Sequence, residues 1–161
     1  RCAMVADRAL DGATWDHHSE ITRQAPSFES LFSNLLQLAE ALEGTRGLSG
    51  GSLLDEVTVV VFSDMGRFPS LNASRGKDHW MTTSMMLFGG GIRGGQVVGA
   101  YSDTFGGVPV VAETGELDPE GSRGSVIGPA AIGATLLTLA GLDPTEAFGP
   151  DIAPITALLH A

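Results

Sequence analysis

The sequence predicts an α/β fold with a mostly parallel sheet, and three segments carry that prediction. Between residues 27 and 42 the apolar side chains recur at helical spacing, which predicts an amphipathic helix. The segment 57–62 (VTVVVF) is almost entirely β-branched or aromatic, which predicts a strand buried on both faces, as in a parallel sheet covered by helices. The apolar segment 129–139 begins with Pro129 and is followed by Gly141, as expected of a buried helix.

Shorter elements are expected around these three segments. Residues 2–10 are apolar and predict a short strand, and residues 85–88 predict another one directly before a glycine-rich stretch. Residues 89–125 are rich in Gly, Asp, Ser and Pro and should form long loops, with one hairpin near 108–111. The chain therefore holds fewer strands than a complete doubly wound sheet needs.

Length and composition indicate a single globular domain. The chain has 161 residues, of which 43% are hydrophobic and 17% charged. It carries 9 Lys and Arg against 19 Asp and Glu, a net charge of −10 that argues against nucleic acid or an anionic membrane as a partner. No apolar run approaches the roughly 20 residues of a membrane-spanning helix, and Cys2 is the only cysteine, which excludes an internal disulfide.

The start of the sequence has the character of an internal position. It opens on Arg1 rather than on a methionine, and no secretory signal is visible. We therefore expect a fragment, a processed product or one chain of a split domain.

The first candidate site segment is 15–20 (WDHHSE), which contains two imidazoles and two carboxylates. In extended backbone, residues two apart point the same way, so Asp16 and His18 can converge on one ion while His17 points elsewhere. A carboxylate with an imidazole suits Zn²⁺, Mn²⁺ or another first-row ion. The alternative is a solvated polar loop.

The second candidate segment, 62–67 (FSDMGR), stands at the carboxyl end of the predicted strand. Open α/β sheets bind their ligands at that edge. Asp64 could be a metal ligand there, Gly66 could admit a close approach of backbone, and Arg67 could hold an oxyanion with two N–H groups. The alternative is that Asp64 caps a turn and pairs with Arg67.

The third candidate segment is the polar loop 76–80 (GKDHW). It offers His79 as a ligand, Asp78 as a group that could orient it, and Lys77 as an anion contact. A single histidine in a loop carries little weight, but three such segments in one small domain favour a site. His160, next to the end of the chain, has no such neighbours and should be solvated.

Two other catalytic signatures find no support. The segment 89–95 (GGGIRGG) lacks the Gly-Lys-Ser/Thr ending of a phosphate loop and the spacing of a dinucleotide fingerprint, so tight turns explain it better. No Gly-x-Ser-x-Gly elbow is present to support a serine-hydrolase triad.

Taken in order, these segments resemble the motifs of a bacterial sulfatase-like family, which run GWDTH, SEFGRTP, GRDHW and GGGxxGG. Here the corresponding segments read TWDHH (14–18), SDMGRFP (63–69), GKDHW (76–80) and GGGIRGG (89–95). The resemblance extends from about Trp15 to Pro144.

The resemblance implies a fold and an activity. The family is placed in the alkaline-phosphatase-like superfamily, whose α/β/α sandwiches bind one or two divalent metals and hydrolyse phosphate or sulfate esters. Residues 1–161 would then be the C-terminal half of such a sandwich, acting on a small-molecule or polymer ester. The superfamily's Ser/Thr nucleophile belongs to the N-terminal half, so activity would need an N-terminal companion segment or chain. Export by the twin-arginine route would make the protein periplasmic or secreted.

The resemblance also implies roles for individual residues. Asp16 and His18 with His79 would form one metal site, and Asp64 would belong to a second. The ion would be Zn²⁺, Mn²⁺, Ca²⁺ or Mg²⁺. The anion contacts would be Arg67 and Lys77.

Two departures from the pattern qualify these roles. The superfamily usually has a histidine ligand after the Asp64 position, where this chain has Met65, and that favours one metal site over two. The first motif reads Asp-His-His instead of Asp-Thr-His, so both His17 and His18 stay open as the ligand. Met65 and the missing nucleophile also motivate an alternative function, a non-catalytic secreted subunit that keeps the fold for binding or assembly.

Overall fold

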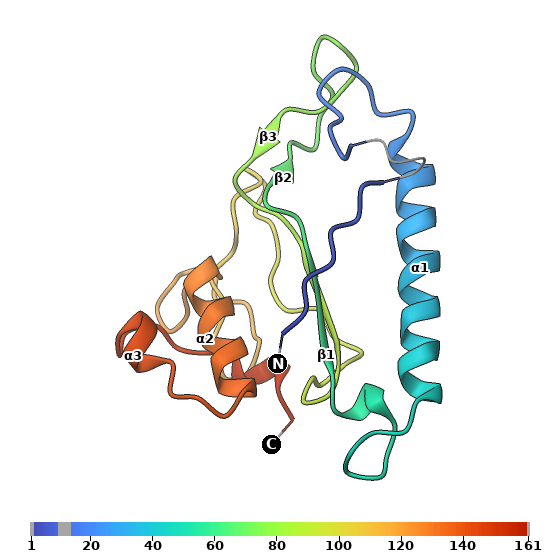
Figure 1. Cartoon of the computed structure of the whole chain (residues 1–161). Coiled ribbons are helices and arrows are strands. Elements are labelled where there is room, and N and C mark those ends of the chain that lie inside the picture. Colours follow the sequence, from blue (N-terminus) through green and yellow to red (C-terminus); the bar gives the residue numbers. More distant parts are fainter. Residues whose placement is uncertain (1, 10–13, 161) are drawn as a thin grey trace. The chain divides into compact units, whose positions relative to one another are not determined.

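The computed structural model describes residues 2–9 and 14–160, which belong to two compact units (Figure 1). The first unit takes in the residues up to 56 together with 61–85, and the second takes in 57–60 and the residues from 86 onward. In chain order the elements are α1 (Gln24–Gly44), η2 (Leu53–Asp55), β1 (Thr58–Phe62), β2 (Gly66–Arg67), β3 (His79–Trp80), β4 (Met85–Gly89), α2 (Pro129–Leu139), α3 (Thr145–Phe148) and η3 (Thr156–Leu158).

Helix α1 confirms the helix predicted for residues 27–42 and begins three residues earlier. Pro26 fits into its first turn because backbone N–H groups there have no partner within the helix. Its apolar face is only partly covered: Ser27 is its one buried residue, while Phe32 and Leu36 are 55% and 60% exposed. Within the described residues, no helix has both the length and the apolar content needed to cross a membrane.

Strands β1 and β4 confirm the two predicted strands and pair with each other. The Gly90 N–H donates to the Val57 carbonyl over 2.9 Å, which places the end of β4 beside the start of β1 and makes the pair antiparallel. The first four residues of β1 are half-buried and the last one, Phe62, is exposed, so the expected burial on both faces does not occur. An apolar run becomes fully buried only where layers cover both faces of the sheet.

The described residues contain two two-stranded sheets, β1 with β4 and β2 with β3. The β2–β3 pair is also antiparallel. The α/β/α sandwich with a mostly parallel sheet therefore remains a prediction.

The apolar core lies in the second unit. The hydrophobic residues buried among the described ones all belong to it: Ile92, Val110, Val111, Ala134, Ile155 and Ala157. Helix α2, which confirms the predicted helix over 129–139, supplies Thr135 to this core, and the Thr135 hydroxyl accepts the Ile155 N–H at 2.8 Å. Gly133 lets the Phe148 ring of α3 lie directly against α2, because a Cβ at that position would overlap with the ring.

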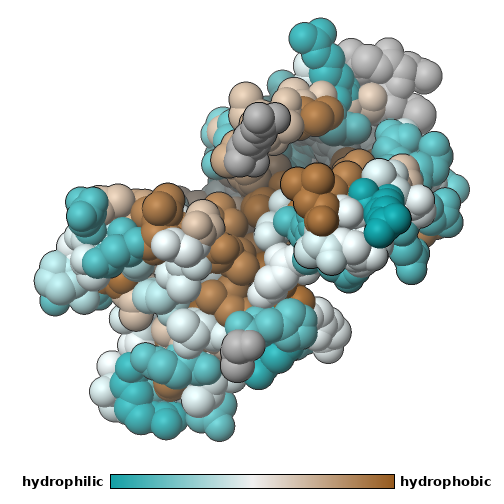
Figure 2. All heavy atoms as spheres, turned by 60° about the horizontal axis from the view of Figure 1, so that its bottom comes forward, coloured by the Kyte–Doolittle hydropathy of each residue, from teal (hydrophilic) through white to brown (hydrophobic). Residues whose placement is uncertain are grey.

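The remaining segments are mostly loops. Residues 2–9 form no helix or strand, contrary to the strand predicted over 2–10, and all of them except the half-buried Ala9 are exposed; Leu10 itself lies outside the described residues. Near the predicted hairpin at 108–111, Val110 forms isolated bridges with both Leu117 and Ser125. Apolar side chains remain exposed at the surface, as the brown areas of Figure 2 illustrate.

Candidate functional site

The second and third motif segments meet through a short ladder in the first unit. Strand β2 pairs with β3 in antiparallel register, with Gly66 opposite Trp80 and Arg67 opposite His79. Side chains directly opposite each other in such a pair lie on the same face. The ladder therefore places the side chains of Arg67 and His79 on the same face of the strand pair.

Two glycines allow the backbone of the three motif segments to come this close. Gly66 is buried, and a Cβ there would overlap with the Thr82 carbonyl oxygen, which confirms the close backbone approach predicted for this glycine. Gly76 is also buried, and a Cβ there would overlap with the carbonyl oxygens of His17 and His18. Real Cβ atoms cannot occupy these positions, so a side chain at either one would force the backbone apart.

Asn72 joins the third segment to the first, and the sequence reasoning missed it. Its amide nitrogen donates to the His18 carbonyl at 2.8 Å and to the Asp78 carboxylate at 2.9 Å. Its amide oxygen accepts the backbone N–H of Gly76 at 3.0 Å. The signal for it is an asparagine a few residues before a glycine, since Asn side chains commonly bond backbone groups in turns.

His18 lies at the centre of the candidate site. Its Nδ1 is in hydrogen-bonding contact with Asp16 Oδ1, and its backbone N–H donates to the same oxygen at 3.1 Å. Its ring centroid is 4.4 Å from that of His79, with the planes tilted by 56°. The hydrogen bond from the His18 side chain, followed by that from its backbone N–H, lowers the pKa of the Asp16 carboxyl. Asp16, His18 and His79 are thus brought together from segments far apart in the sequence.

His17 faces in a different direction. Only 3% of it is exposed, and its ring meets the edge of Trp15 at a centroid distance of 6.3 Å. Its carbonyl oxygen accepts the Lys77 N–H at 2.8 Å. The alternation expected of extended backbone therefore places His18 beside Asp16 and leaves His17 in a packing role.

The Arg67 guanidinium lies among acceptors of the protein itself. Its Nη1 is 3.1 Å from both ring nitrogens of His18 and donates to the Lys77 carbonyl at 3.3 Å. Its Nη2 donates to the Trp15 carbonyl at 3.5 Å and lies 3.6 Å from Asp16 Oδ1. The side chain is 19% exposed. Arg67 therefore contacts the first and third segments from its position in the second.

The other predicted residues have smaller roles in this geometry. Asp64 is exposed, and among the described residues its contact is with the Ser63 hydroxyl at 3.4 Å, so it neither joins His18 nor pairs with Arg67. Lys77 is half-buried and takes part in the site through its backbone. The Asp78 carboxylate accepts from Asn72, and no contact with the His79 ring is found for it in the described parts of the chain.

The side chains around His18 are of the types that bind metal ions. Two imidazoles and a carboxylate suit a first-row ion such as Zn²⁺ or Mn²⁺. Across residues 2–9 and 14–160, however, no group of three or more His, Cys, Asp or Glu side chains is placed to hold an ion. What the structure provides is a carboxylate–imidazole contact and an imidazole–imidazole contact around His18.

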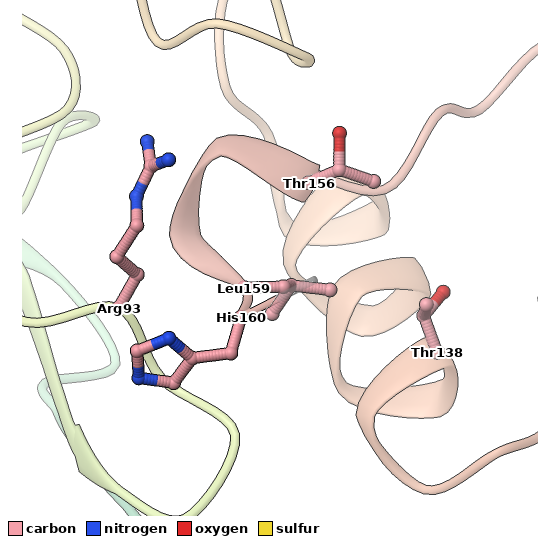
Figure 3. A pocket seen from close by; sticks show the side chains of 5 residues that line it. All are labelled: Arg93, Thr138, Thr156, Leu159 and His160. Carbon is pink, nitrogen blue, oxygen red and sulfur yellow. The ribbon is translucent and has the colours of Figure 1, made fainter.

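A depression of about 530 Å³ lies in the second unit (Figure 3). It is lined by Arg93, Thr138, Thr156, Leu159 and His160. The Arg93 N–H donates to the Leu158 carbonyl at 2.8 Å and the His160 N–H to the Gly91 carbonyl at 3.0 Å, which holds the glycine-rich segment beside the last residues of the chain. His160 is exposed, as predicted.

Comparison with known proteins gives a family and nothing more detailed. A family model described as "Protein of unknown function (DUF1501)" matches residues 1–150. No curated protein matches the chain, and no solved structure matches it. Because the matched region covers most of the 161 residues, the chain belongs to the DUF1501 family.

Proposed function

We propose that this chain forms part of a metal-dependent hydrolase that cleaves phosphate or sulfate esters. The observation that carries the proposal is that His18 contacts both the Asp16 carboxylate and the His79 ring in the first unit. The motif resemblance to the alkaline-phosphatase-like superfamily supports the same chemistry.

In the proposed site, Asp16, His18 and His79 would hold one divalent cation. A bound cation lowers the pKa of a nucleophile and neutralises charge on the transferring group. The imidazoles favour Zn²⁺ or Mn²⁺ over Mg²⁺ and Ca²⁺, which prefer oxygen ligands. Through its contact with Nδ1, Asp16 orients the His18 ring. Nε2, the other ring nitrogen, lies 3.1 Å from Arg67 Nη1, so the guanidinium would have to move for a metal to bind there. One site is proposed instead of two, because Asp64 stands apart from the other candidates.

The proposed substrate is anionic, so a positively charged side chain should contact it. Lys77 is the candidate contact for the ester's anionic group, because its ammonium forms no hydrogen bond or ion pair within the described residues. The ester itself is a small molecule or a polymer. The nucleophile would be supplied by an N-terminal companion segment or chain, in a periplasmic or secreted protein.

Metal content tests this proposal independently of turnover. We expect purified protein, incubated with Zn²⁺ or Mn²⁺ and then dialysed, to retain about one equivalent by elemental analysis. His79→Ala should lose most of that metal, whereas His160→Ala, which removes an exposed histidine of the second unit, should retain it. Wild-type protein that retains no divalent metal would overturn the proposal.

A non-catalytic secreted subunit is the second candidate. It is favoured by Met65 and by the isolation of Asp64, because a site with a single, incomplete ligand set has less capacity for turnover. For such a subunit we expect metal-free protein whose melting temperature is the same in wild type and His79→Ala.

A further inference from the structure

We infer that an exposed apolar row on helix α1 binds a helix of a partner protein, one whose apolar side is flanked by Lys or Arg. The row consists of Phe28, Phe32 and Leu36, and we call it the α1 strip. The inference concerns the first unit alone and depends neither on a metal ion nor on the proposed hydrolase activity.

The side chains of the α1 strip follow one another at intervals of four residues, which places them in one row along the helix. Phe28, Phe32 and Leu36 are 41%, 55% and 60% exposed. The Phe28 and Phe32 rings stack at a centroid distance of 6.1 Å, so this end of the row is continuous. On the adjoining side of the helix, Leu31 and Leu35 are half-buried. Within the described residues, one apolar side of α1 is thus partly covered and the neighbouring side is open, as is typical of a surface that binds a partner helix.

Carboxylates lie along the edge of the α1 strip. Glu29 and Glu43 stand seven residues before and after Leu36, and such residues share a side of the helix. Glu40 stands four residues after Leu36 and continues the row. All three carboxylates are exposed, and none forms an ion pair within the described residues. Since the segment 24–44 contains no Lys or Arg, the strip has an acidic edge that the helix does not neutralise.

This acidic edge selects among the possible occupants of the α1 strip. In an antiparallel pair of two copies centred on Leu36, Glu29 of each copy would face Glu43 of the other, and juxtaposed like charges oppose association. Helices that lie on anionic membranes carry Lys and Arg on their polar face, which α1 lacks. A partner helix with Lys or Arg beside its apolar residues complements both the row and its edge.

The experiment measures the binding of a fluorescent synthetic peptide designed as a helix with a row of leucines flanked by lysines. We expect it to bind at least about tenfold more tightly at low salt than the same peptide with glutamates in place of the lysines. Phe32→Glu should weaken binding of the lysine peptide by at least about tenfold, because it places a charge within the apolar row. The control Leu48→Glu makes the same change at a fully exposed loop residue of the same unit and should alter binding by less than about twofold.

The sign of the Phe32→Glu effect separates binding at the α1 strip from nonspecific attraction. The chain has a net charge of −10 and this variant adds another negative charge, so nonspecific attraction to a basic peptide would stay equal or increase. Glutamate is a good helix former, and far-UV circular dichroism should show wild-type helix content in the variant. Equal or tighter binding of the lysine peptide by Phe32→Glu would overturn the inference.

A double variant tests the acidic edge without changing the apolar row. Glu40→Gln with Glu43→Gln should weaken binding of the lysine peptide by about two- to tenfold at low salt. Asp103→Asn with Asp151→Asn removes the same charge from exposed residues of the second unit and should have less than about a twofold effect. An equal loss in the two double variants would assign the binding to overall charge and contradict the inference.

Cysteine labelling decides whether something else covers the α1 strip. In a Cys2→Ser background, Leu36→Cys should react with a maleimide in the protein alone and be protected by the lysine peptide. Protection of this cysteine in a monomer without peptide would mean that the chain itself covers the strip. A dimer, or binding to phosphatidylglycerol vesicles, that Phe32→Glu abolishes would assign the strip to a second copy or to a membrane. Each of these three outcomes would overturn the inference.

Discussion

The two units of this chain are organised by different forces. In the described part of the second unit, six apolar residues are buried, and the Thr135 hydroxyl links helix α2 to the final segment. Among the described residues of the first unit, those that are buried are polar or glycine, and they include His17, Ser27, Gly66 and Gly76. The candidate site is therefore assembled by hydrogen bonds and close backbone approaches, whereas the second unit is assembled by apolar packing.

This difference has a consequence for how each unit responds to change. Apolar packing distributes its stabilisation over many contacts, so one substitution removes only part of the stability of the unit. Backbone contacts at van der Waals distance admit no added atom, and a hydrogen-bonded loop depends on a few donors and acceptors. Substitutions in the first unit should therefore abolish the site while leaving the protection of the second unit intact.

The largest effect is expected at Gly76. Gly76→Val should force the third segment away from the first, because even a Cβ overlaps with the carbonyl oxygens of His17 and His18. We expect a loss of about 3 kcal/mol in local stability, at the upper end of overpacking costs. Hydrogen exchange should accelerate throughout residues 66–80 and stay unchanged in 92–111 and 130–157.

Gly44→Ala is the matched control for this substitution. No heavy atom lies within 4 Å of a Cβ at Gly44, and alanine favours the helix in which it sits. Its exchange pattern should match that of wild type. If Gly76→Val also accelerates exchange across the core of the second unit, the two units are not independent and the comparison fails.

The next effect is expected at Thr135, in the second unit. Thr135→Val keeps the shape of the side chain but removes the acceptor of the Ile155 N–H, which is buried and 2.8 Å from the hydroxyl. An unsatisfied buried donor costs about 1–3 kcal/mol, and denaturant unfolding should show that loss. Thr138→Val on the same helix should cost less, because the Thr138 hydroxyl donates to a carbonyl of its own helix, that of Ala134, and accepts no N–H group among the described residues. Equal losses in the two variants would contradict the role given to Thr135.

A smaller effect is expected at Asn72, in the first unit. Asn72→Ala removes the bond to the His18 carbonyl and the acceptor of the Gly76 N–H. Because Asn72 is half-buried, water replaces part of these bonds, and we expect a loss of about 1 kcal/mol. Asn72→Asp keeps the acceptor but loses the donor, so its hydrogen exchange at residues 72–78 should be intermediate. Wild-type exchange in Asn72→Ala would show that the glycines suffice to hold the segments together.

The same contrast explains how far the sequence predicts this structure. Helices α1 and α2 and strands β1 and β4 follow from periodicity and composition, which act locally. The antiparallel pairing of β1 with β4 does not follow, because an apolar run shows that a strand exists and says nothing about its direction. Strands β2 and β3 have two residues each, too few to show any period.

For the candidate site, the motif residues were predictable and their connections were not. The motifs selected Asp16, Asp64, His79 and either His17 or His18, and in the structure His18 contacts both Asp16 and His79. The contacts of Asn72 and Arg67 depend on which carbonyl oxygens approach each other in space, and sequence spacing holds no information on that. Asp64 is also selected by the resemblance. In the described residues, however, its carboxylate contacts the Ser63 hydroxyl, away from His18 and its two neighbours.

The smallest expected effect is on the loss of stability at acidic pH. It tests whether polar contacts also matter in the second unit, whose buried core is apolar. Asp118 is buried, and its carboxylate accepts the N–H groups of Arg123 at 2.6 Å and Gly124 at 2.8 Å. These bonds, the one from Arg123 first, lower the pKa of Asp118 in the folded protein. The carboxylate therefore stabilises the fold above the pKa of an unfolded aspartate, about 3.9, and this contribution is lost as the pH falls through the lower folded value.

Asp118→Asn removes that titration, so between pH 5 and pH 2.5 the melting temperature should fall further in wild type than in the variant. The control Asp103→Asn alters an exposed loop residue and should retain the wild-type pH dependence. An equal acid response in wild type and Asp118→Asn would mean that apolar packing alone holds the 118–124 loop in place. The second unit would then contrast with the hydrogen-bonded first unit even more sharply than the burial of its residues indicates.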